Sequence, residues 1–167
     1  PNVPALDVLS ADFATAGSSF GVVVRVDDIP ELPVDPNSPA GHEWFVLFSV
    51  GERTFFVDAR SSATGDAIYL YEQEPFPGSG KLIGALDGVI DRTRDEVRIW
   101  GLLSLLGAAE DVRKGTPVLV LEVLSARFVG VTAAGSRDPL AFPVHADFTD
   151  PGRTYTIGRP SCVKVGS

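Results

Sequence analysis

Apolar side chains recur at every second position in several stretches of this sequence, and this spacing constrains the fold more than any other feature. In the stretch "SSFGVVVRVDD", residues 18–28, one face is apolar and consists of Phe20, Val22, Val24 and Val26. The other face carries Arg25 and Asp27. A period of two is typical of a strand that buries one face. The sequence therefore predicts a half-buried strand here.

The next apolar stretch, "HEWFVLFSV", is apolar on both faces, which is typical of a central strand. Its predicted core face consists of Trp44, Val46, Phe48 and Val50. The short link "GER" separates it from "TFFVDAR", which offers Phe55 and Val57. A link of this length that contains glycine predicts a β-hairpin. We expect this hairpin near the centre of a sheet.

Further strands are expected over residues 66–74, 81–88, 95–100, 116–131, 140–148 and 154–158. The strand at 81–88 is expected to end in an Asp-Gly turn, and Val97 and Ile99 are expected to point inward. One short helix is expected within "WGLLSLLGAAEDVRKG", residues 100–115, because its leucines could cover an edge of the core. Residues 27–43 and 74–80 are rich in proline and predict long loops.

Three aspartates, Asp87, Asp91 and Asp95, follow one another at a spacing of four. An EF-hand calcium loop that begins at Asp87 would need glycine at its sixth position and glutamate at its twelfth, where this chain has Arg92 and Arg98. We therefore interpret the segment as a solvated bend between two strands.

A chain of 167 residues with 44% apolar and 22% charged residues is typical of one globular domain. About ten strands and one short helix favour an all-β fold, a two-layer antiparallel β-sandwich of jelly-roll kind over residues 1–167. A closed barrel is the alternative. The longest apolar run is interrupted by Glu122 and Arg127, so no membrane insertion is expected.

The net charge is −8, and the Lys and Arg residues are scattered singly, so nucleic acid is not an expected partner. Cys162 is the only cysteine and cannot form an internal disulfide, which leaves open what, if anything, it pairs with. The chain contains no Met and begins "PNVPALDV". We therefore expect a mature fragment, or a domain attached to further domains in a longer chain.

The order of the segments resembles a known sandwich superfamily. "DVLSADF" leads into a strand, a Pro-rich loop follows, and then come "EWFVLFSVGERTFFVDAR", "LDGVIDRTRDEVRIW" and a Leu-rich turn before a long strand. Over most of residues 5–158 this layout is similar to DOMON domains and family 9 carbohydrate-binding modules, and to modules attached to secreted bacterial and archaeal proteins. The resemblance implies an extracellular or cell-surface location and non-catalytic binding, of sugars in some relatives and of haem in others.

Haem-binding relatives typically use a Met and a His, but this chain has no Met and only His42 and His145. Sugar binding uses exposed aromatic rings, for which Trp100, Tyr69 and Tyr71 are the candidates. Trp44 shares a face with Val46 and is expected in the core. Core packing is the competing interpretation for each of these aromatic residues.

Calcium is the candidate cofactor, as a structural ion. Asp27 and Asp28 end a strand and enter a long loop, where carboxylates and carbonyls often gather around calcium, with Asp7 or Asp147 as spatial partners. No serine-hydrolase elbow and no zinc-protease motif are present, so an enzyme is not expected.

The expected function is that of a non-catalytic accessory module of a secreted or cell-surface protein, acting in structural or protein interaction. The alternative is a carbohydrate-binding module of a secreted enzyme, which requires two aromatic side chains exposed on one face. A haem-binding DOMON-type domain and a small hydrolase are less favoured.

Overall fold

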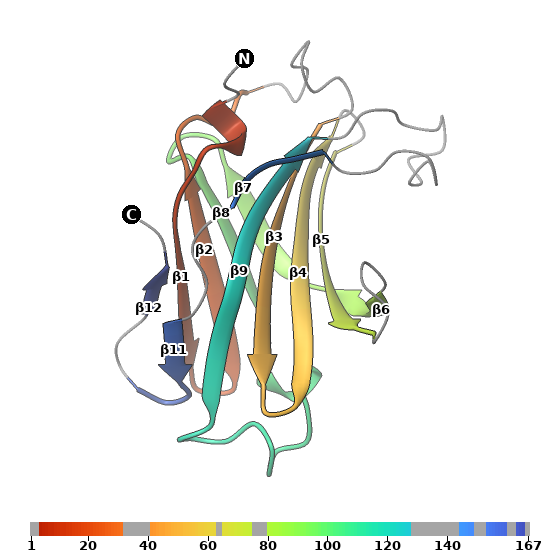
Figure 1. Ribbon diagram of the computed structural model, residues 1–167, viewed down its shortest axis with the longest axis vertical. Coiled ribbons are helices and arrows are strands. Elements are labelled where there is room, and N and C mark those ends of the chain that lie inside the picture. The colour runs from red at the N-terminus through yellow and green to blue at the C-terminus, as the bar shows by residue number, and fades with distance from the viewer. Residues whose placement is uncertain are drawn as a thin grey trace.

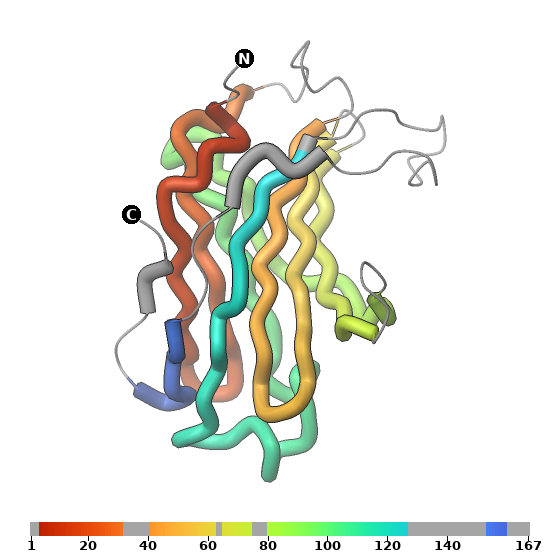
Figure 2. The backbone as a smooth tube through the Cα atoms, viewed as in Figure 1, coloured from red at the N-terminus to blue at the C-terminus, as the bar shows by residue number. Residues whose placement is uncertain are grey.

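Two antiparallel β-sheets pack face to face in the computed structural model of this protein, which confirms the all-β sandwich (Figure 1). The structure describes residues 4–31, 41–62, 65–74, 80–127, 144–148, 153–159 and 163–165, and covers 144–148 and 163–165 through their backbone pairing alone. Most strands run along the long axis of the molecule (Figure 2), and each strand pair is antiparallel. The two sheets are separate, so the closed barrel is not the fold.

The strands, in chain order, are β1 (Val8–Ala16), β2 (Ser19–Val26), β3 (His42–Val50), β4 (Arg53–Ser62), β5 (Gly65–Gln73), β6 (Gly80–Ala85), β7 (Asp87–Asp91), β8 (Glu96–Leu102), β9 (Pro117–Arg127), β10 (Val144–Phe148), β11 (Arg153–Thr156) and β12 (Val163–Val165). The described residues contain no α-helix, only the 3₁₀ turns η1 (Pro4–Leu6) and η2 (Leu103–Leu105).

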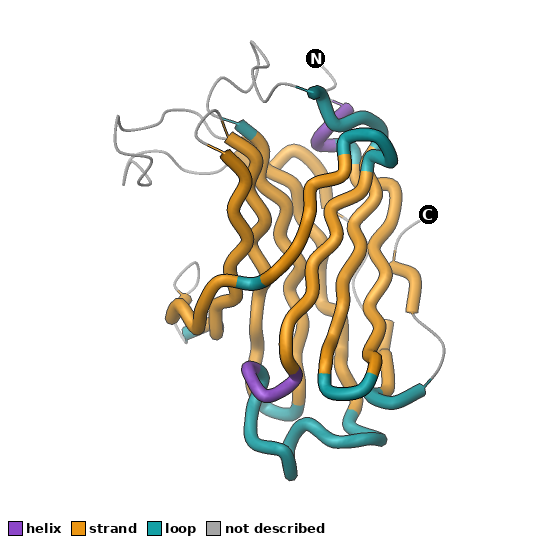
Figure 3. Tube along the Cα trace, turned by 180° about the vertical axis from the view of Figure 1, so that it is seen from behind, coloured by secondary structure: helices purple, strands orange, loops and turns teal. Residues whose placement is uncertain are grey.

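The five-stranded sheet has the order β12-β1-β2-β8-β7, and the seven-stranded sheet has the order β10-β9-β3-β4-β5-β6, with β11 also paired to β9. Strands β3, β4 and β5 form a meander, and β9 returns from far along the chain to lie beside β3. This order, β9-β3-β4-β5, is a Greek-key arrangement. The chain passes from one sheet to the other between β6 and β7, at Leu86 (Figure 3).

The period of two correctly predicted which faces are buried. The described core side chains on β2, β3, β4 and β8 that had been expected inside are all at most 5% exposed: Phe20, Val22, Val24, Val26, Trp44, Val46, Phe48, Val50, Phe55, Val57, Val97 and Ile99. As expected, β3 and β4 lie in the interior of their sheet, between β9 and β5.

Aromatic rings join the two sheets at the centre of the core. Phe48 of β3 lies 5.4 Å from Phe13 of β1, 6.2 Å from Phe20 of β2 and 5.8 Å from Phe55 of β4, measured between ring centroids. The indole Nε1 of Trp44 donates a hydrogen bond of 2.9 Å to the carbonyl of Ala5, so this buried polar atom is satisfied. Rings from both layers therefore form one continuous core.

Two expectations for residues 81–115 were wrong. No α-helix forms within residues 100–115, and Trp100 to Leu102 continue β8 instead, where they pair with Gly21 to Ser19 of β2. The leucines that follow enter the short turn η2 and the loop after it, where Leu103 and Leu106 are buried. Likewise Asp87 and Gly88 form no turn, because they begin β7 and pair with Trp100 and Ile99.

The bend lies between β7 and β8, after the strand that begins at Asp87. The interpretation of the acidic segment as a bend therefore holds for Asp91 and Asp95 and not for Asp87. The Asp91 carboxylate accepts hydrogen bonds from the N–H groups of Thr93 and Arg94. Asp95 has a φ of 55°, and its carboxylate accepts a hydrogen bond of 2.9 Å from the N–H of Ile29.

The strands β1 and β12 were not predicted.

Candidate functional site

Trp100 lies on the outer face of the five-stranded sheet, opposite the buried face of β8, as expected. Its side chain is 45% exposed. The register places Gly21 of β2 beside it on one side and Asp87 of β7 on the other. Directly opposed residues on antiparallel strands share a face and have Cβ atoms about 5 Å apart. Trp100 therefore stands between a position without a side chain and an exposed carboxylate.

Trp100 belongs to a group of exposed apolar residues on this face. Val89 of β7 is 43% exposed and Leu102 of β8 is 54% exposed. Val89 pairs with Arg98, two residues before Trp100, and Leu102 lies two residues after it, so all three side chains point outward from neighbouring strands. We refer to Val89, Trp100 and Leu102 as the β7–β8 patch. Exposed apolar residues grouped in this way mark interaction surfaces more often than singly scattered ones do.

A network of ion pairs occupies the other half of the same outer face. Arg25 of β2 pairs with Asp12 of β1 and with Glu96 of β8, the latter at 3.0 Å. Arg98 pairs with Glu96 at 2.7 Å and with Asp91 of β7 at 3.5 Å. The hydrogen bond from Arg98, together with the charges of both arginines, holds the pKa of Glu96 below its ordinary value despite partial burial. The network links four neighbouring strands.

Tyr69 and Tyr71 lie on the outer face of the other sheet, so the structure does not bring them to Trp100. Tyr71 stacks on Phe56 of β4, with ring centroids 4.8 Å apart and planes 8° apart. The Arg60 guanidinium lies 5.7 Å from the centre of the Tyr69 ring. Both tyrosines are half-buried, and their rings are already engaged by neighbouring side chains. They do not form an open pair of aromatic rings.

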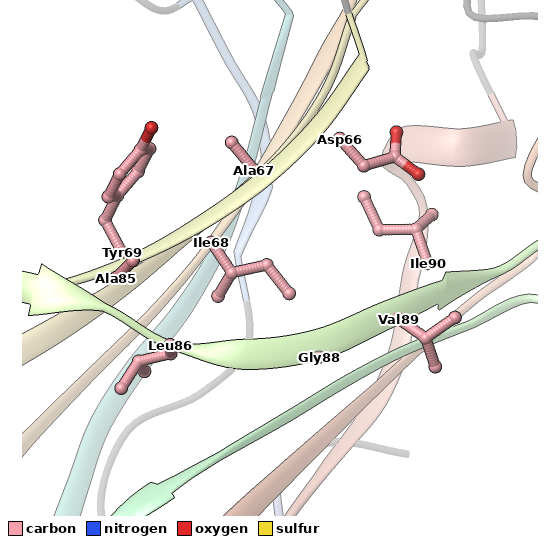
Figure 4. A pocket seen from close by; sticks show the side chains of 9 residues that line it. All are labelled: Asp66, Ala67, Ile68, Tyr69, Ala85, Leu86, Gly88, Val89 and Ile90. Carbon is pink, nitrogen blue, oxygen red and sulfur yellow. The ribbon is translucent and has the colours of Figure 1, made fainter.

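A pocket of about 340 Å³ opens between β5 and β7, where the two sheets separate beyond Leu86 (Figure 4). Ile68 of β5 and Ile90 of β7 point into this space, and Tyr69 points to the other side of β5. The N–H of Leu86 donates a hydrogen bond of 3.0 Å to the carbonyl of Ile68, which closes one end. The pocket floor is mainly apolar.

An ion pair lies at the rim of this edge pocket. Two nitrogens of Arg92 lie 3.0 Å and 2.9 Å from the carboxylate oxygens of Asp66, a residue that lines the pocket. The same guanidinium donates a hydrogen bond to the Ser61 hydroxyl. Because Arg92 neutralises Asp66, the pocket offers no uncompensated charge to a ligand there.

A larger hollow of about 610 Å³ lies at the opposite end of the sandwich. It is bounded by the turn between β1 and β2, the η2 region and the end of β11, with Leu102, Leu103, Val112 and Ile157 among its apolar lining. Leu102 also belongs to the β7–β8 patch, and Val89 lines the edge pocket. The patch therefore extends between the two hollows.

Buried charges occur on the outward-pointing side of the β3–β4 hairpin, a feature that sequence reasoning missed. The side chains of Glu43 and Asp58 are 0% exposed, and Arg60 pairs with both, at 3.0 Å from Glu43. Burial alone would lower the pKa of Arg60, but the hydrogen bond to Asp58 and the charges of Asp58 and Glu43 raise it overall. The only available signal was the placement of charged residues within otherwise apolar strands.

Asp27 and Asp28, the predicted calcium ligands, are exposed. The N–H of Asp27 donates a hydrogen bond of 3.1 Å to the carbonyl of Asp7, so these two residues are close through their backbones. The described part of the chain contains no group of three or more His, Cys, Asp or Glu side chains suited to a metal ion. The side chain of Asp147 lies outside the described residues. Calcium binding at Asp27 and Asp28 stays a prediction.

His42, considered for haem, is buried on the core side of β3, with its ring centroid 6.1 Å from that of Trp44. The side chain of His145, the other histidine of the chain, lies outside the described residues, as does Cys162. The structure therefore does not test whether the two histidines bind haem.

No protein-family model matches the chain, and comparisons with characterised proteins and with solved structures find no significant match. The resemblance to DOMON domains and family 9 modules is therefore retained only as the β-sandwich architecture. Within the described residues, no helix has the length and apolar character needed to cross a membrane.

Proposed function

We propose that this chain is a non-catalytic accessory module of a secreted or cell-surface protein, and that it binds another protein through the β7–β8 patch. The observation that carries the proposal is the grouping of Val89, Trp100 and Leu102, each more than 40% exposed, on one face of two paired strands. A face built on regular strands has an ordered backbone, so a partner that binds it incurs no cost of ordering a loop. Tryptophan is also the residue type most enriched among the energetic centres of protein interfaces.

A protein partner fits this face better than a carbohydrate. Sugar platforms need two exposed aromatic rings on one face, whereas Trp100 has no aromatic companion among the described residues of its outer face, and Tyr69 and Tyr71 lie on the other sheet. Carbohydrate binding stays the second candidate, because an exposed tryptophan beside the polar side chain of Asp87 is a feature that sugar sites share. The carboxylates of Glu43 and Asp58 are held by Arg60, which supports a non-catalytic role.

Site-specific photo-crosslinking tests the proposal and has a matched control. A photo-activatable leucine analogue replaces either Leu102, which is 54% exposed in the β7–β8 patch, or Leu82, which is 53% exposed on the other sheet. The crosslinks are formed on cells that produce the complete parent protein. We expect a discrete protein adduct from position 102 that is lost with Trp100→Ala, and none from position 82.

Equal adducts from both positions, or an adduct that survives Trp100→Ala, would rule out this face as the protein-binding surface. A glycan array probed with the chain and with Trp100→Ala separates the second candidate. Binding of a defined glycan that is lost with Trp100→Ala, in the absence of a protein adduct, would replace the protein partner by a carbohydrate.

A further inference from the structure

The charges around Trp100 are unevenly compensated. The ion-pair network uses both arginines of this face, Arg25 and Arg98, and their partners are Asp12, Asp91 and Glu96. The fourth acidic residue of the face, Asp87, is exposed and forms no ion pair with the described residues. It is also the direct cross-strand neighbour of Trp100. A carboxylate that no described cation neutralises therefore stands beside an exposed indole.

The opposite side of Trp100 is open. Gly21 occupies the neighbouring position on β2, and a Cβ atom placed there would have only the carbonyl oxygen of Ile99 within 4 Å, at 3.7 Å. Among the described residues no cation lies over the indole, because the cation–π contacts there involve only Phe55 and Tyr69. Arg98, two residues before Trp100 on β8, is held by Glu96 and Asp91. Space beside the ring is available to a ligand.

An aromatic face next to an uncompensated carboxylate has the chemistry that recognises a cation. The ring quadrupole attracts a positive group. The guanidinium of arginine is a better match than the ammonium of lysine, because it is planar, stacks on indole and is more weakly hydrated. The net charge of −8 on the whole chain attracts a basic partner and repels a second copy of this chain. Charge complementarity thus favours a basic segment over an apolar or acidic one.

We propose that Trp100 and Asp87 form a subsite for an arginine side chain of the partner protein. The guanidinium stacks on the indole of Trp100 and pairs with the carboxylate of Asp87, while Val89 and Leu102 contact the apolar surface around that arginine. This inference rests on the proposed function, because it names the chemistry of the partner that binds the β7–β8 patch.

A peptide titration followed by NMR tests the subsite directly. The chain has two tryptophans, so its spectrum contains two indole N–H signals. The indole of Trp44 is buried, and its N–H donates a hydrogen bond to the carbonyl of Ala5. The ligand is a short capped peptide with two arginines, and the control ligand carries citrulline, which has a similar shape and no charge. We expect the arginine peptide to shift the Trp100 signal and to bind at least about 5-fold more tightly than the citrulline peptide.

Variants of the chain separate the subsite from general charge attraction. We expect Asp87→Asn to weaken binding of the arginine peptide about 2- to 5-fold, and Glu52→Gln, which removes an equal charge from an exposed position outside this face, to leave it unchanged. Gly21→Val fills the open side of the ring without a steric clash at Cβ and should also weaken binding. Similar affinities for both peptides, equal effects of Asp87→Asn and Glu52→Gln, or no binding would each overturn the subsite.

The photo-crosslink from position 102 distinguishes failure of the subsite from failure of the proposed function. A yield that falls with Asp87→Asn and vanishes with Trp100→Ala supports both. If Trp100→Ala abolishes the adduct and Asp87→Asn leaves it unchanged, the arginine subsite is wrong and the protein-binding face stands. If neither substitution changes the adduct, the binding face itself is wrong.

Discussion

Phe48 has the central position in the aromatic packing between the sheets, in contact with Phe13, Phe20 and Phe55. Because this ring is fully buried, Phe48→Ala should lower the free energy of unfolding by about 3–5 kcal/mol, through lost burial and the cavity left behind. Chemical denaturation measures the loss. The same substitution at Phe56, a half-buried ring on the outer face, should cost about 1–2 kcal/mol. A loss below about 1 kcal/mol at Phe48 would mean that its ring lies outside the core.

Asp95 combines two constraints in the bend between β7 and β8. Its φ of 55° disfavours residues with an ordinary side chain, and its carboxylate accepts a hydrogen bond from Ile29. We expect Asp95→Ala to lower the free energy of unfolding by about 1–3 kcal/mol, and Asp95→Asn to cost clearly less, because asparagine tolerates this conformation and keeps an acceptor oxygen. Equal losses of unfolding free energy for Asp95→Ala and Asp95→Asn in urea denaturation would show that neither constraint matters.

The carboxylate of Asp91 is engaged by backbone N–H groups within its own turn and by the ion pair with Arg98, so it is not free to bind a metal ion. We expect Asp91→Asn to leave the response of the melting temperature to calcium unchanged. Thermal melts of the parent and the variant, each with calcium and with a chelator, measure this response. A drop caused by the chelator in the parent but absent in Asp91→Asn would establish a calcium site in the bend. A calcium effect that persists in the variant would point to Asp27 and Asp28.

At the scale of residues, the sequence predicted side-chain burial where the period of two was regular. It placed Trp44 inside, as observed, and it offered Trp100 as a candidate exposed ring with core packing as the competing interpretation; Trp100 is 45% exposed. It could not predict that Asp87 would stand beside Trp100 or Gly21 on its other side, because those neighbours come from the register of three strands that are distant in the sequence. The buried charges of Glu43 and Asp58 were missed because these residues lie opposite the predicted core positions of their strands, and alternation does not show what covers that second face.

At the scale of elements, the ion-pair network links β1, β2, β8 and β7 side by side across one sheet. Such a network favours the observed register of its strands, because each arginine reaches carboxylates on neighbouring strands. Its centre is Glu96, which pairs with both Arg25 and Arg98 and whose side chain is 15% exposed. Its contribution depends on ionisation of that carboxylate.

The lowered pKa of Glu96 predicts how stability depends on pH. Because the folded-state pKa lies below the ordinary value of 4.5, the unfolded chain binds more protons between the two values. The stabilisation is fully present above pH of about 5 and is lost as the pH falls through the folded-state pKa. Glu96→Gln should therefore be less stable than the parent near neutral pH, and the difference should shrink toward pH 3.

Urea denaturation from pH 3 to pH 7 measures this difference, with Glu110→Gln as the control because Glu110 is an exposed acid in the loop after η2. A difference between parent and Glu96→Gln that stays constant across this range would show that ionisation of Glu96 does not contribute to folding.

Element types were predictable where alternation was clear, and the two errors have one cause. The leucines near residue 103 and the Asp-Gly pair at 87–88 carry strong local preferences, for a helix and for a turn. Pairing with β2 and within the β7–β8 hairpin overrides both preferences. Such pairing partners cannot be read from local sequence.

At the scale of the whole molecule, side chains from both sheets contribute to one core cluster, so neither sheet has a core of its own. We expect thermal unfolding to be one cooperative transition, with coincident curves for secondary structure and for the environment of Trp44. Circular dichroism and fluorescence of Trp100→Phe, in which Trp44 is the only tryptophan, provide the two curves. Two separated transitions would show that the sheets unfold independently.

The pairing of β2 with β8 has a consequence for synthesis of the chain. Val22 pairs with Ile99, which follows it by 99 − 22 = 77 residues, so β2 leaves the ribosome long before its partner. At translation rates of roughly 5–20 residues per second, the wait is roughly 4–15 s. During that time the backbone edge of β2 on the β8 side has no partner strand. This unpaired edge leaves the nascent chain open to chaperones, and to aggregation, until β8 emerges.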